Sequence, residues 1–418
     1  MPLAASDRAY LRDLAQRVAQ IAADPYYAER RDLWYGFNDL KPRRPMVLIF
    51  PEGSWVELLP DSTMRLEDVF WRRQEWYLRY VIYRREHLRD DNVIDPILEV
   101  PPARGAVGWG LEVRMSERTM ARGAAAYDPV IREPSDFRKM TRPYLHVNHK
   151  HNKETYERLH EVFGDILTIR WKRSPGINTS LVNFVCYLRG LEQAMIDMVE
   201  RPGWLHEVFR FLMENTDRLL DELEASRQLE LMDGTDYAGS GGTCYTRQLP
   251  PPDYIPGRPR CKDTWGFAES QEYTGISPKM YHEFGIKYQV PLLERFGLNC
   301  YGCCEDLTDK LDLVIQHVPH LRRISISPWT DVEVAAEKLR NRFIFSWKPR
   351  PTMVTDPYSP DAIRKEIRRT LEVAKGCVVE MILKDTHTCN NHPERMTEWV
   401  RIAQEEAERA ATRPVACV

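Results

Sequence analysis

The stretch from Gly297 to Glu305 joins an apolar run to a cluster of possible metal ligands. It reads Gly-Leu-Asn-Cys-Tyr-Gly-Cys-Cys-Glu, so a short strand would end in two thiols and a carboxylate. Thiolates select zinc and other borderline or soft metals, and a nearby carboxylate can bind the same metal or move a proton. Because neighbouring side chains of a strand point to opposite faces, Cys303 and Cys304 could share one ion only if a turn begins at Gly302. A buried strand end without chemistry is the alternative for an isolated Cys-Cys pair.

Composition narrows the possible classes of protein. With 418 residues, 43% of them hydrophobic, the chain can bury a substantial core. The net charge of −3, from 59 basic and 62 acidic residues, gives no electrostatic reason to expect a nucleic-acid partner. No apolar run is long enough to cross a bilayer, and the start of the chain does not resemble a signal peptide, so we expect a cytoplasmic protein without a membrane partner. Nine cysteines, an odd number, favour free thiols or metal ligands over disulfides.

Predicted strands and helices alternate along the second half of the chain. A first buried strand is predicted at 46–50, and later strands at 229–233, 264–268, 297–301, 323–327, 342–347 and 377–383, with helices at 278–295, 306–317, 331–340, 360–375 and 393–410. Such alternation predicts a parallel sheet with helices outside, and this many units favours a closed TIM (β/α)8 barrel over an open sheet. We therefore expect an α/β fold with one barrel domain over residues 1–418.

Two regions lie outside this repeat. Residues 1–40 are charged and show helical spacing of apolar residues, which predicts an N-terminal helical extension. Residues 92–156 are proline-rich and irregular, with one strand pair predicted around Val107 to Met115. We expect this segment to form an inserted cap, with a position facing the substrate as one possibility.

Polar residues follow the predicted strands, and in a TIM barrel the loops after the strands build the active site. Three of these exits supply possible zinc ligands: Glu269 or Glu272, Cys303 or Cys304, and His387 or Cys389. Tyr301 and Trp265 could line an aromatic or corrinoid pocket, or could be ordinary barrel packing. The run Gly239-Ser240-Gly241-Gly242 could cradle an anion or let a corrinoid approach the backbone.

In order and spacing, several motifs resemble the uroporphyrinogen decarboxylase superfamily, within it the branch of corrinoid-linked methyltransferases. The resemblance covers roughly residues 160–410 and depends on these motifs: Phe163-Gly164-Asp165, residues 188–192 (LRGLE), residues 239–242 (GSGG), residues 265–272 (WGFAESQE), residues 301–305 (YGCCE) and residues 384–389 (KDTHTC). It implies a TIM barrel of uroporphyrinogen decarboxylase type that is often a homodimer. It also implies zinc at the barrel mouth and a cobalt corrinoid (cobalamin) on a separate partner protein.

The family's zinc motif matches this chain in part. A His-x-Cys motif of the family falls on Tyr301-Gly302-Cys303, and its second cysteine falls on Cys389. Cys303 and Cys389 therefore match, whereas the histidine is Tyr301 in this chain. His387, Glu269 or Glu305 could replace it, and Cys304 could add a further thiolate, so the ligand set stays open.

The resemblance implies a methyltransferase that acts on a small methylated substrate, in the first place an O-methyl compound. The methyl group would pass to cob(I)alamin on the partner protein, with zinc as Lewis acid and with Glu269, Glu272, Tyr301 and Glu305 as candidate catalytic residues. The direction of transfer stays open. Two alternatives remain: a cofactor-free decarboxylase, although the motif of that enzyme near the first strand is not reproduced, and a non-catalytic barrel that binds a tetrapyrrole or corrinoid.

Overall fold

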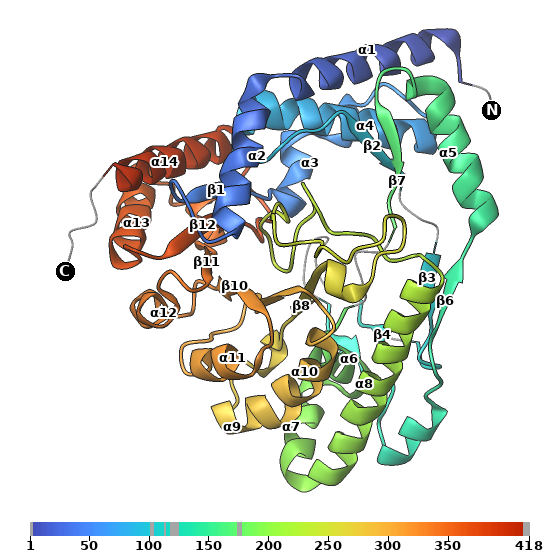
Figure 1. The fold of residues 1–418 in the computed structure, drawn as a ribbon, viewed down its shortest axis with the longest axis vertical. Helices are drawn as coiled ribbons and strands as arrows, with labels where there is room; N and C mark the ends of the chain where they lie inside the picture. Colours follow the sequence, from blue (N-terminus) through green and yellow to red (C-terminus); the bar gives the residue numbers. More distant parts are fainter. Residues whose placement is uncertain (1–2, 101–103, 113, 118–124, 174–177, 413–418) are drawn as a thin grey trace. The chain divides into compact units, whose positions relative to one another are not determined.

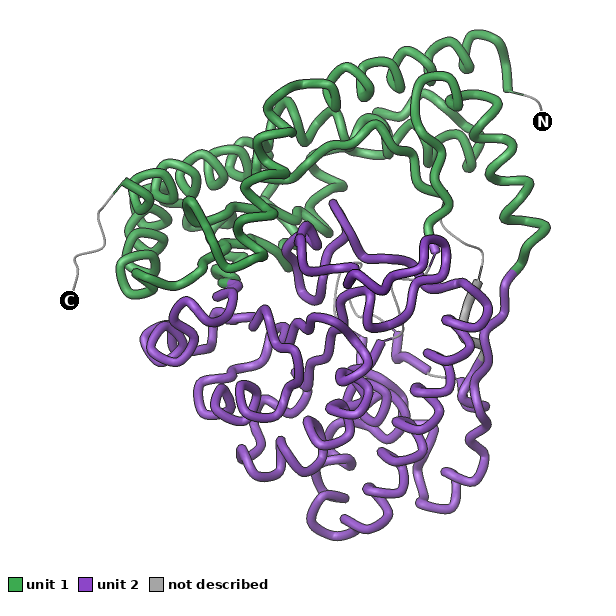
Figure 2. Tube along the Cα trace, viewed as in Figure 1, with its two compact units in different colours: residues 1–103, 148–172, 347–418 green, residues 104–147, 173–346 purple. Residues whose placement is uncertain are grey.

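The computed structural model describes residues 3–100, 104–112, 114–117, 125–173 and 178–412. The chain divides into two compact units, shown in Figure 2. Unit 1 contains residues 1–103, 148–172 and 347–418, and unit 2 contains residues 104–147 and 173–346. The units are described separately below, and the expectation of one domain over the whole chain stays a prediction.

Parallel strands form the centre of unit 2. They are β8 (Trp265–Ala268), β9 (Leu298–Tyr301), β10 (Leu321–Ile326) and β11 (Ile344–Trp347), whose last residue begins the closing part of unit 1. Their order is β11-β10-β9-β8, and β9 pairs in parallel with both β8 and β10, so that Tyr301 lies opposite Ala268 on one side and Ile324 on the other. The carboxyl ends of β8, β9 and β10 therefore meet at one edge.

Helices follow these strands, as the sequence predicts (Figure 1). The segment after β8 contains α9 (Pro278–Tyr281), a π-helix (His282–Ile286) and α10 (Lys287–Leu293), so the expected helix 278–295 is present with a wider turn in its middle. Helices α11 (Leu311–His317) and α12 (Val332–Leu339) follow β9 and β10. Helices α6 (Leu181–Arg189), α7 (Leu191–Glu200) and α8 (Pro202–Ala225) precede the sheet in the chain.

The small strands of unit 2 correct one prediction. The expected pair around Val107 to Met115 is wrong, because β3 (Arg104–Val107) pairs with β6 (Tyr144–Val147), and β4 (Arg114–Met115) pairs with β5 (Tyr127–Asp128). Gly108 and Gly110 have positive φ angles of 38° and 80°, and the Thr141 N–H donates to the Trp109 carbonyl at 2.8 Å. The chain thus turns at these glycines toward a segment that is distant in sequence.

Unit 1 contains a parallel strand pair and most of the terminal helices. All four residues of β1 (Met46–Ile49) are buried, and β1 pairs in parallel with β12 (Val378–Leu383). Helices α13 (Pro360–Val373) and α14 (Glu394–Ala411) pack against each other, as Figure 1 shows in red, and α14 also contacts β1. The remaining elements are α1 (Ala5–Ala22), α2 (Pro25–Asn38), α3 (Trp55–Leu58), α4 (Val69–Tyr83), a π-helix (Arg84–Leu88), α5 (His149–Phe163) and the parallel pair β2 (Ile97–Val100) and β7 (Thr168–Trp171).

Side-chain carboxylates satisfy part of the backbone of β1. The Val47 N–H donates to Asp91 at 2.8 Å, and the Ile49 N–H donates to Asp90 at 3.0 Å. Both aspartates are buried and pair with arginines, Asp91 with Arg44 at 2.6 Å and Asp90 with Arg84 at 2.5 Å. Because a buried charge without a partner is costly, these four charges depend on one another and fix this part of unit 1.

The α/β architecture with parallel strands and flanking helices agrees with the sequence, and closure into an eight-stranded barrel stays a prediction. The predicted strand at 229–233 is wrong. There the Met232 N–H donates to the Thr264 hydroxyl at 2.7 Å, and the Cys244 N–H donates back to the Gly234 carbonyl at 3.1 Å. Side-chain and turn contacts thus replace a strand ladder. Within the described ranges, no helix combines the length and apolarity needed to span a membrane.

Candidate functional site

The segment Gly302 to Glu305, called the thiol loop below, follows β9. Gly302 has a φ of +88°, and a side chain at this position would approach Leu307 to 2.9 Å, so the predicted turn at Gly302 is confirmed and requires glycine. Cys303 is half-buried and Cys304 is exposed, with the two Sγ atoms 3.5 Å apart. The loop thus presents two neighbouring thiols at the carboxyl end of a parallel strand.

Glu305 holds this loop in place. Its carboxylate accepts the Cys303 N–H at 2.7 Å, the Ser270 N–H at 3.1 Å and the Tyr281 hydroxyl at 3.3 Å. The residue is only 1% exposed. Hydrogen bonds to a buried carboxylate are stronger than neutral ones, so Glu305 fixes Cys303 relative to the end of β8.

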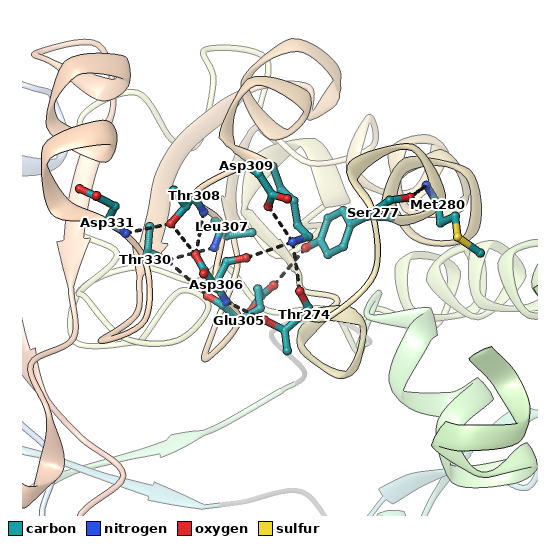
Figure 3. A network of polar contacts seen from close by, with 12 residues as sticks. Thr274, Ser277, Met280, Glu305, Asp306, Leu307, Thr308, Asp309, Thr330 and Asp331 are labelled. Carbon is teal, nitrogen blue, oxygen red and sulfur yellow. Dashed lines mark hydrogen bonds and ion pairs between the residues drawn. The ribbon is translucent and has the colours of Figure 1, made fainter. Parts of the chain in front are cut away.

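Further hydrogen bonds join the loops after β8, β9 and β10, as Figure 3 shows. The Asp306 N–H donates to the Thr274 hydroxyl at 2.9 Å, and the Leu307 N–H donates to the Thr330 hydroxyl at 3.0 Å. Lys310, with a side chain 3% exposed, donates to the Thr274 carbonyl at 3.1 Å. Since backbone groups supply most of these contacts, the edge around the thiols is well fixed.

Glu269 lies directly after β8, next to Cys303, and is 8% exposed. Its N–H donates to the Ser180 hydroxyl at 3.1 Å, and its Oε1 accepts the Asn183 amide at 3.3 Å. Its Oε2 has no hydrogen-bond partner among the residues that the structure describes. Burial, followed by the neighbouring Cys303 and Glu305, raises the pKa of the Glu269 carboxyl to about 9. A buried carboxyl group with a free oxygen thus lies beside the thiol loop.

The two other predicted catalytic residues differ in their surroundings. Glu272 is half-buried, burial raises the pKa of its carboxyl group, and its Oε2 has no partner within the described residues. Tyr301 is fully buried, and its hydroxyl lies 3.2 Å from that of Tyr281 and 3.0 Å from Gln289 Oε1. The Tyr301 hydroxyl therefore belongs to a polar network beneath the thiol loop.

The glycine run lies near the thiol loop and packs closely on the sheet. Ser325 on β10 donates to the Cys303 carbonyl at 2.9 Å, and its hydroxyl lies 3.2 Å from that of Ser240. A side chain at Gly239 would approach Cys300 to 2.8 Å, and one at Gly242 would approach the Arg323 guanidinium to 2.6 Å. Gly241 is buried between these positions. Close packing thus accounts for glycine at positions 239 and 242.

Trp265, a predicted cofactor-binding residue, lies in the core of unit 2. It is 1% exposed and belongs to a cluster with Ala238, Cys244, Leu298 and Cys300. This position is typical of packing. A role in cofactor binding stays a prediction.

The remaining predicted ligands, His387 and Cys389, follow β12 in unit 1. His387 is exposed, whereas the side chain of Cys389 is fully buried. Glu57 Oε2 accepts the Cys389 N–H at 2.9 Å, the Cys389 thiol at 3.1 Å and the Asn391 N–H at 2.9 Å. Burial and the hydrogen bond to Glu57 raise the pKa of the Cys389 thiol to about 12.

The residues of unit 2 fit a zinc ion in part. Cys303 offers a thiol, and Glu269 offers a carboxyl oxygen that has no protein partner in the described chain. Zinc accepts such a mixture of sulfur and oxygen ligands. Over residues 3–412, leaving aside the segments not described, no three His, Cys, Asp or Glu side chains already form a group that could hold a metal. The predicted contributions of Cys304, His387 and Cys389 stay open.

The sequence matches no family model and no curated protein. Among solved structures, the chain is similar in fold to a methyltransferase from Methanosarcina mazei, with a TM-score of 0.51 and 11% sequence identity. The alignment covers 90% of this chain and 97% of that chain. At this identity the likeness supports the α/β architecture of the chain, over nearly its full length.

Proposed function

We propose that this protein is a methyltransferase. It moves a methyl group from a small methylated substrate to a cobalt corrinoid on a partner protein, with zinc bound at the thiol loop. The observation that carries the proposal is the closeness of Cys303 to the buried carboxyl group of Glu269 at the carboxyl ends of β8 and β9, where the Glu269 Oε2 has no hydrogen-bond partner in the described chain. The shared fold with a methyltransferase from Methanosarcina mazei supports it by analogy.

Cys303 and Glu269 would hold the zinc ion, with the neighbouring Cys304 as a further ligand. When bound, zinc supplies Lewis acidity to the atom from which the methyl group departs. Thiolate and carboxylate ligands together are compatible with a position left open for substrate.

The protein's own residues position and shield this chemistry. Glu305 and Ser325 hold the backbone of Cys303 through its N–H and its carbonyl oxygen. The methyl–oxygen bond of the substrate breaks, the methyl group passes to cobalt(I), and the oxygen keeps the bonding electrons. Glu272 carries a carboxyl oxygen without a partner in the described chain, and such a group can give a proton to the departing oxygen.

The test is methyl transfer from small methyl ethers to free cob(I)alamin, followed by the absorbance change to methylcob(III)alamin. Cys303→Ser should lower the rate at least about 100-fold, because removal of a ligand disturbs a metal site more than removal of its outer partners. Cys377→Ser, which changes a half-buried cysteine in unit 1, should leave the rate unchanged. Equal rates in wild type and Cys303→Ser would contradict the proposal. Metal-independent release of carbon dioxide would favour a decarboxylase.

A further inference from the structure

Asn183, Tyr187, Glu269 and Glu272, called the acceptor cluster below, bring unpartnered oxygens together in unit 2. The Asn183 amide is 4% exposed and donates to Glu269 Oε1 and to the Tyr187 hydroxyl, both at 3.3 Å. Its Oδ1 is buried and has no partner in the described chain, and the same holds for Oε2 of Glu269 and of Glu272. Three buried oxygens of the cluster therefore lack a hydrogen-bond partner among the described residues.

The charges of the cluster are also unbalanced. The described residues include no ion pair to Glu269 or Glu272, although arginines pair with most other buried carboxylates of the chain, such as Asp91 and Asp197. The charges of Glu272 and Glu305 both act on Glu269. A ligand that brings N–H groups and positive charge therefore complements these buried Oε2 atoms, which have no donor and no countercharge among the described residues. An anionic ligand would add repulsion.

The cluster is connected to the surface and to an aromatic face. Glu272 and Tyr187 are half-buried, and the Tyr187 ring stacks on that of Tyr127 with centroids 4.2 Å apart. Tyr127 is 37% exposed. Tyrosine faces attract cations, including alkylated nitrogens, within about 6 Å of the ring.

We propose that the acceptor cluster binds a protonated amine carried by the substrate. The amine site would define the substrate class of the proposed methyltransferase. Amine binding itself does not depend on that function, whereas transfer of the methyl group does. Zinc bound by Cys303 and Glu269 still leaves Asn183 Oδ1 and Glu272 Oε2 for the N–H donors. The substrate is then a small amine with a methylated group that reaches the thiol loop.

Calorimetric titration of the protein as purified with three probes of similar size tests the proposal. The probes are 2-methoxyethylammonium, neutral 1,2-dimethoxyethane and anionic methoxyacetate. We expect saturable binding of the cation, with an affinity at least about tenfold above that of the other two, since only the cation supplies charged donors. The variants Glu272→Gln and Asn183→Ala should each weaken binding of the cation about tenfold. The control Glu283→Gln, the same substitution at another glutamate of unit 2, should leave the affinity for the cation unchanged.

Equal or tighter binding of either other probe, no saturable binding of the cation, or an unchanged affinity in Glu272→Gln would overturn the inference. Circular dichroism melting of each variant confirms that it is folded. The inference and the proposed function fail separately. If the protein binds the amine but transfers no methyl group, the proposed methyltransferase function is wrong and the amine site stands. If it transfers methyl groups from neutral ethers but does not bind the amine, only the amine site is wrong.

Discussion

Cysteines follow two strands of the protein, β9 in unit 2 and β12 in unit 1, and their thiols have opposite surroundings. In the thiol loop of unit 2, Glu305 accepts the backbone N–H of Cys303, and the thiol itself stays half-exposed beside Cys304 and the carboxyl group of Glu269. After β12 in unit 1, Glu57 accepts both the N–H and the thiol of Cys389, whose side chain is fully buried.

The difference shows that the atom a carboxylate binds decides how available a neighbouring cysteine is. A carboxylate that accepts the S–H proton, together with burial, keeps a thiol protonated, as the pKa of about 12 for Cys389 indicates. A carboxylate that accepts only the backbone N–H fixes the position of the residue. We therefore expect metal capture and thiol chemistry to begin at Cys303.

Loss of the Glu305 carboxylate should have the largest effect. Glu305→Ala leaves the Cys303 and Ser270 N–H groups and the Tyr281 hydroxyl without their acceptor, so we expect the free energy of unfolding to fall by about 3–5 kcal/mol. Urea denaturation followed by tryptophan fluorescence measures the change. The control Asp312→Ala, at a carboxylate 76% exposed, should change the free energy of unfolding by less than about 1 kcal/mol. A similar fall in the free energy of unfolding in both variants would show that Glu305 does not stabilise the thiol loop more than an exposed carboxylate does.

Acid should loosen helix α14 in unit 1 more than the thiol loop of unit 2. Hydrogen bonds from Arg368, then from Arg364 and Arg409, lower the pKa of Glu406 on α14 to about 2, below its usual 4.5. Its stabilisation is fully present above about pH 4.5 and is lost as the pH falls toward 2, by roughly 2–3 kcal/mol in total. Hydrogen exchange at pH 3 and pH 6, corrected for intrinsic rates, should show faster exchange in 394–411 at acid pH. Unchanged protection there, or equal loosening of 298–305, would contradict this.

Alkylation should separate the two cysteines by reactivity. A brief pulse of N-ethylmaleimide at pH 7.5 on the protein stripped of metal, read by peptide mass spectrometry, should label Cys303 and Cys304 at least about tenfold faster than Cys389, because Cys389 is buried and protonated. Glu57→Gln removes the negative charge beside the Cys389 thiol and should reduce the ratio of the labelling rate of Cys303 to that of Cys389. Equal labelling rates of Cys303 and Cys389 in the wild type would show that their surroundings do not change their reactivity.

Loss of one neutral hydrogen bond should have the smallest effect. Ser325→Ala removes the donor to the Cys303 carbonyl, so we expect a loss of about 1 kcal/mol and faster hydrogen exchange at Gly302 and Cys303. Ser226→Ala, which removes a hydroxyl bonded within its own helix end, is the matched control. No local change in exchange would show that Ser325 does not hold the loop.

The sequence predicts the main elements of this fold because local patterns specify them. Largely apolar runs mark β1 and β12, and glycine marks the turn at Gly302. The wrong strand at 229–233 had the same apolar pattern, and its backbone instead pairs with Thr264 and with turns that no local pattern encodes.

The partners of the candidate site could not be read from the sequence. Glu57 is 332 residues from Cys389, and Asn183 is 86 residues from Glu269. Ser325 lies inside a strand that reads as ordinary core. Proximity of this kind arises only when strand exits meet in the folded chain, so spacing gives no signal for it.

The most direct test of the account is the zinc content of the protein purified without added metal, for wild type, Cys303→Ser and Cys377→Ser. We expect about one zinc per chain in wild type and in Cys377→Ser, and loss of that zinc in a folded Cys303→Ser variant. Zinc retained in Cys303→Ser, or a folded wild type that takes up no zinc when it is supplied, would contradict the account.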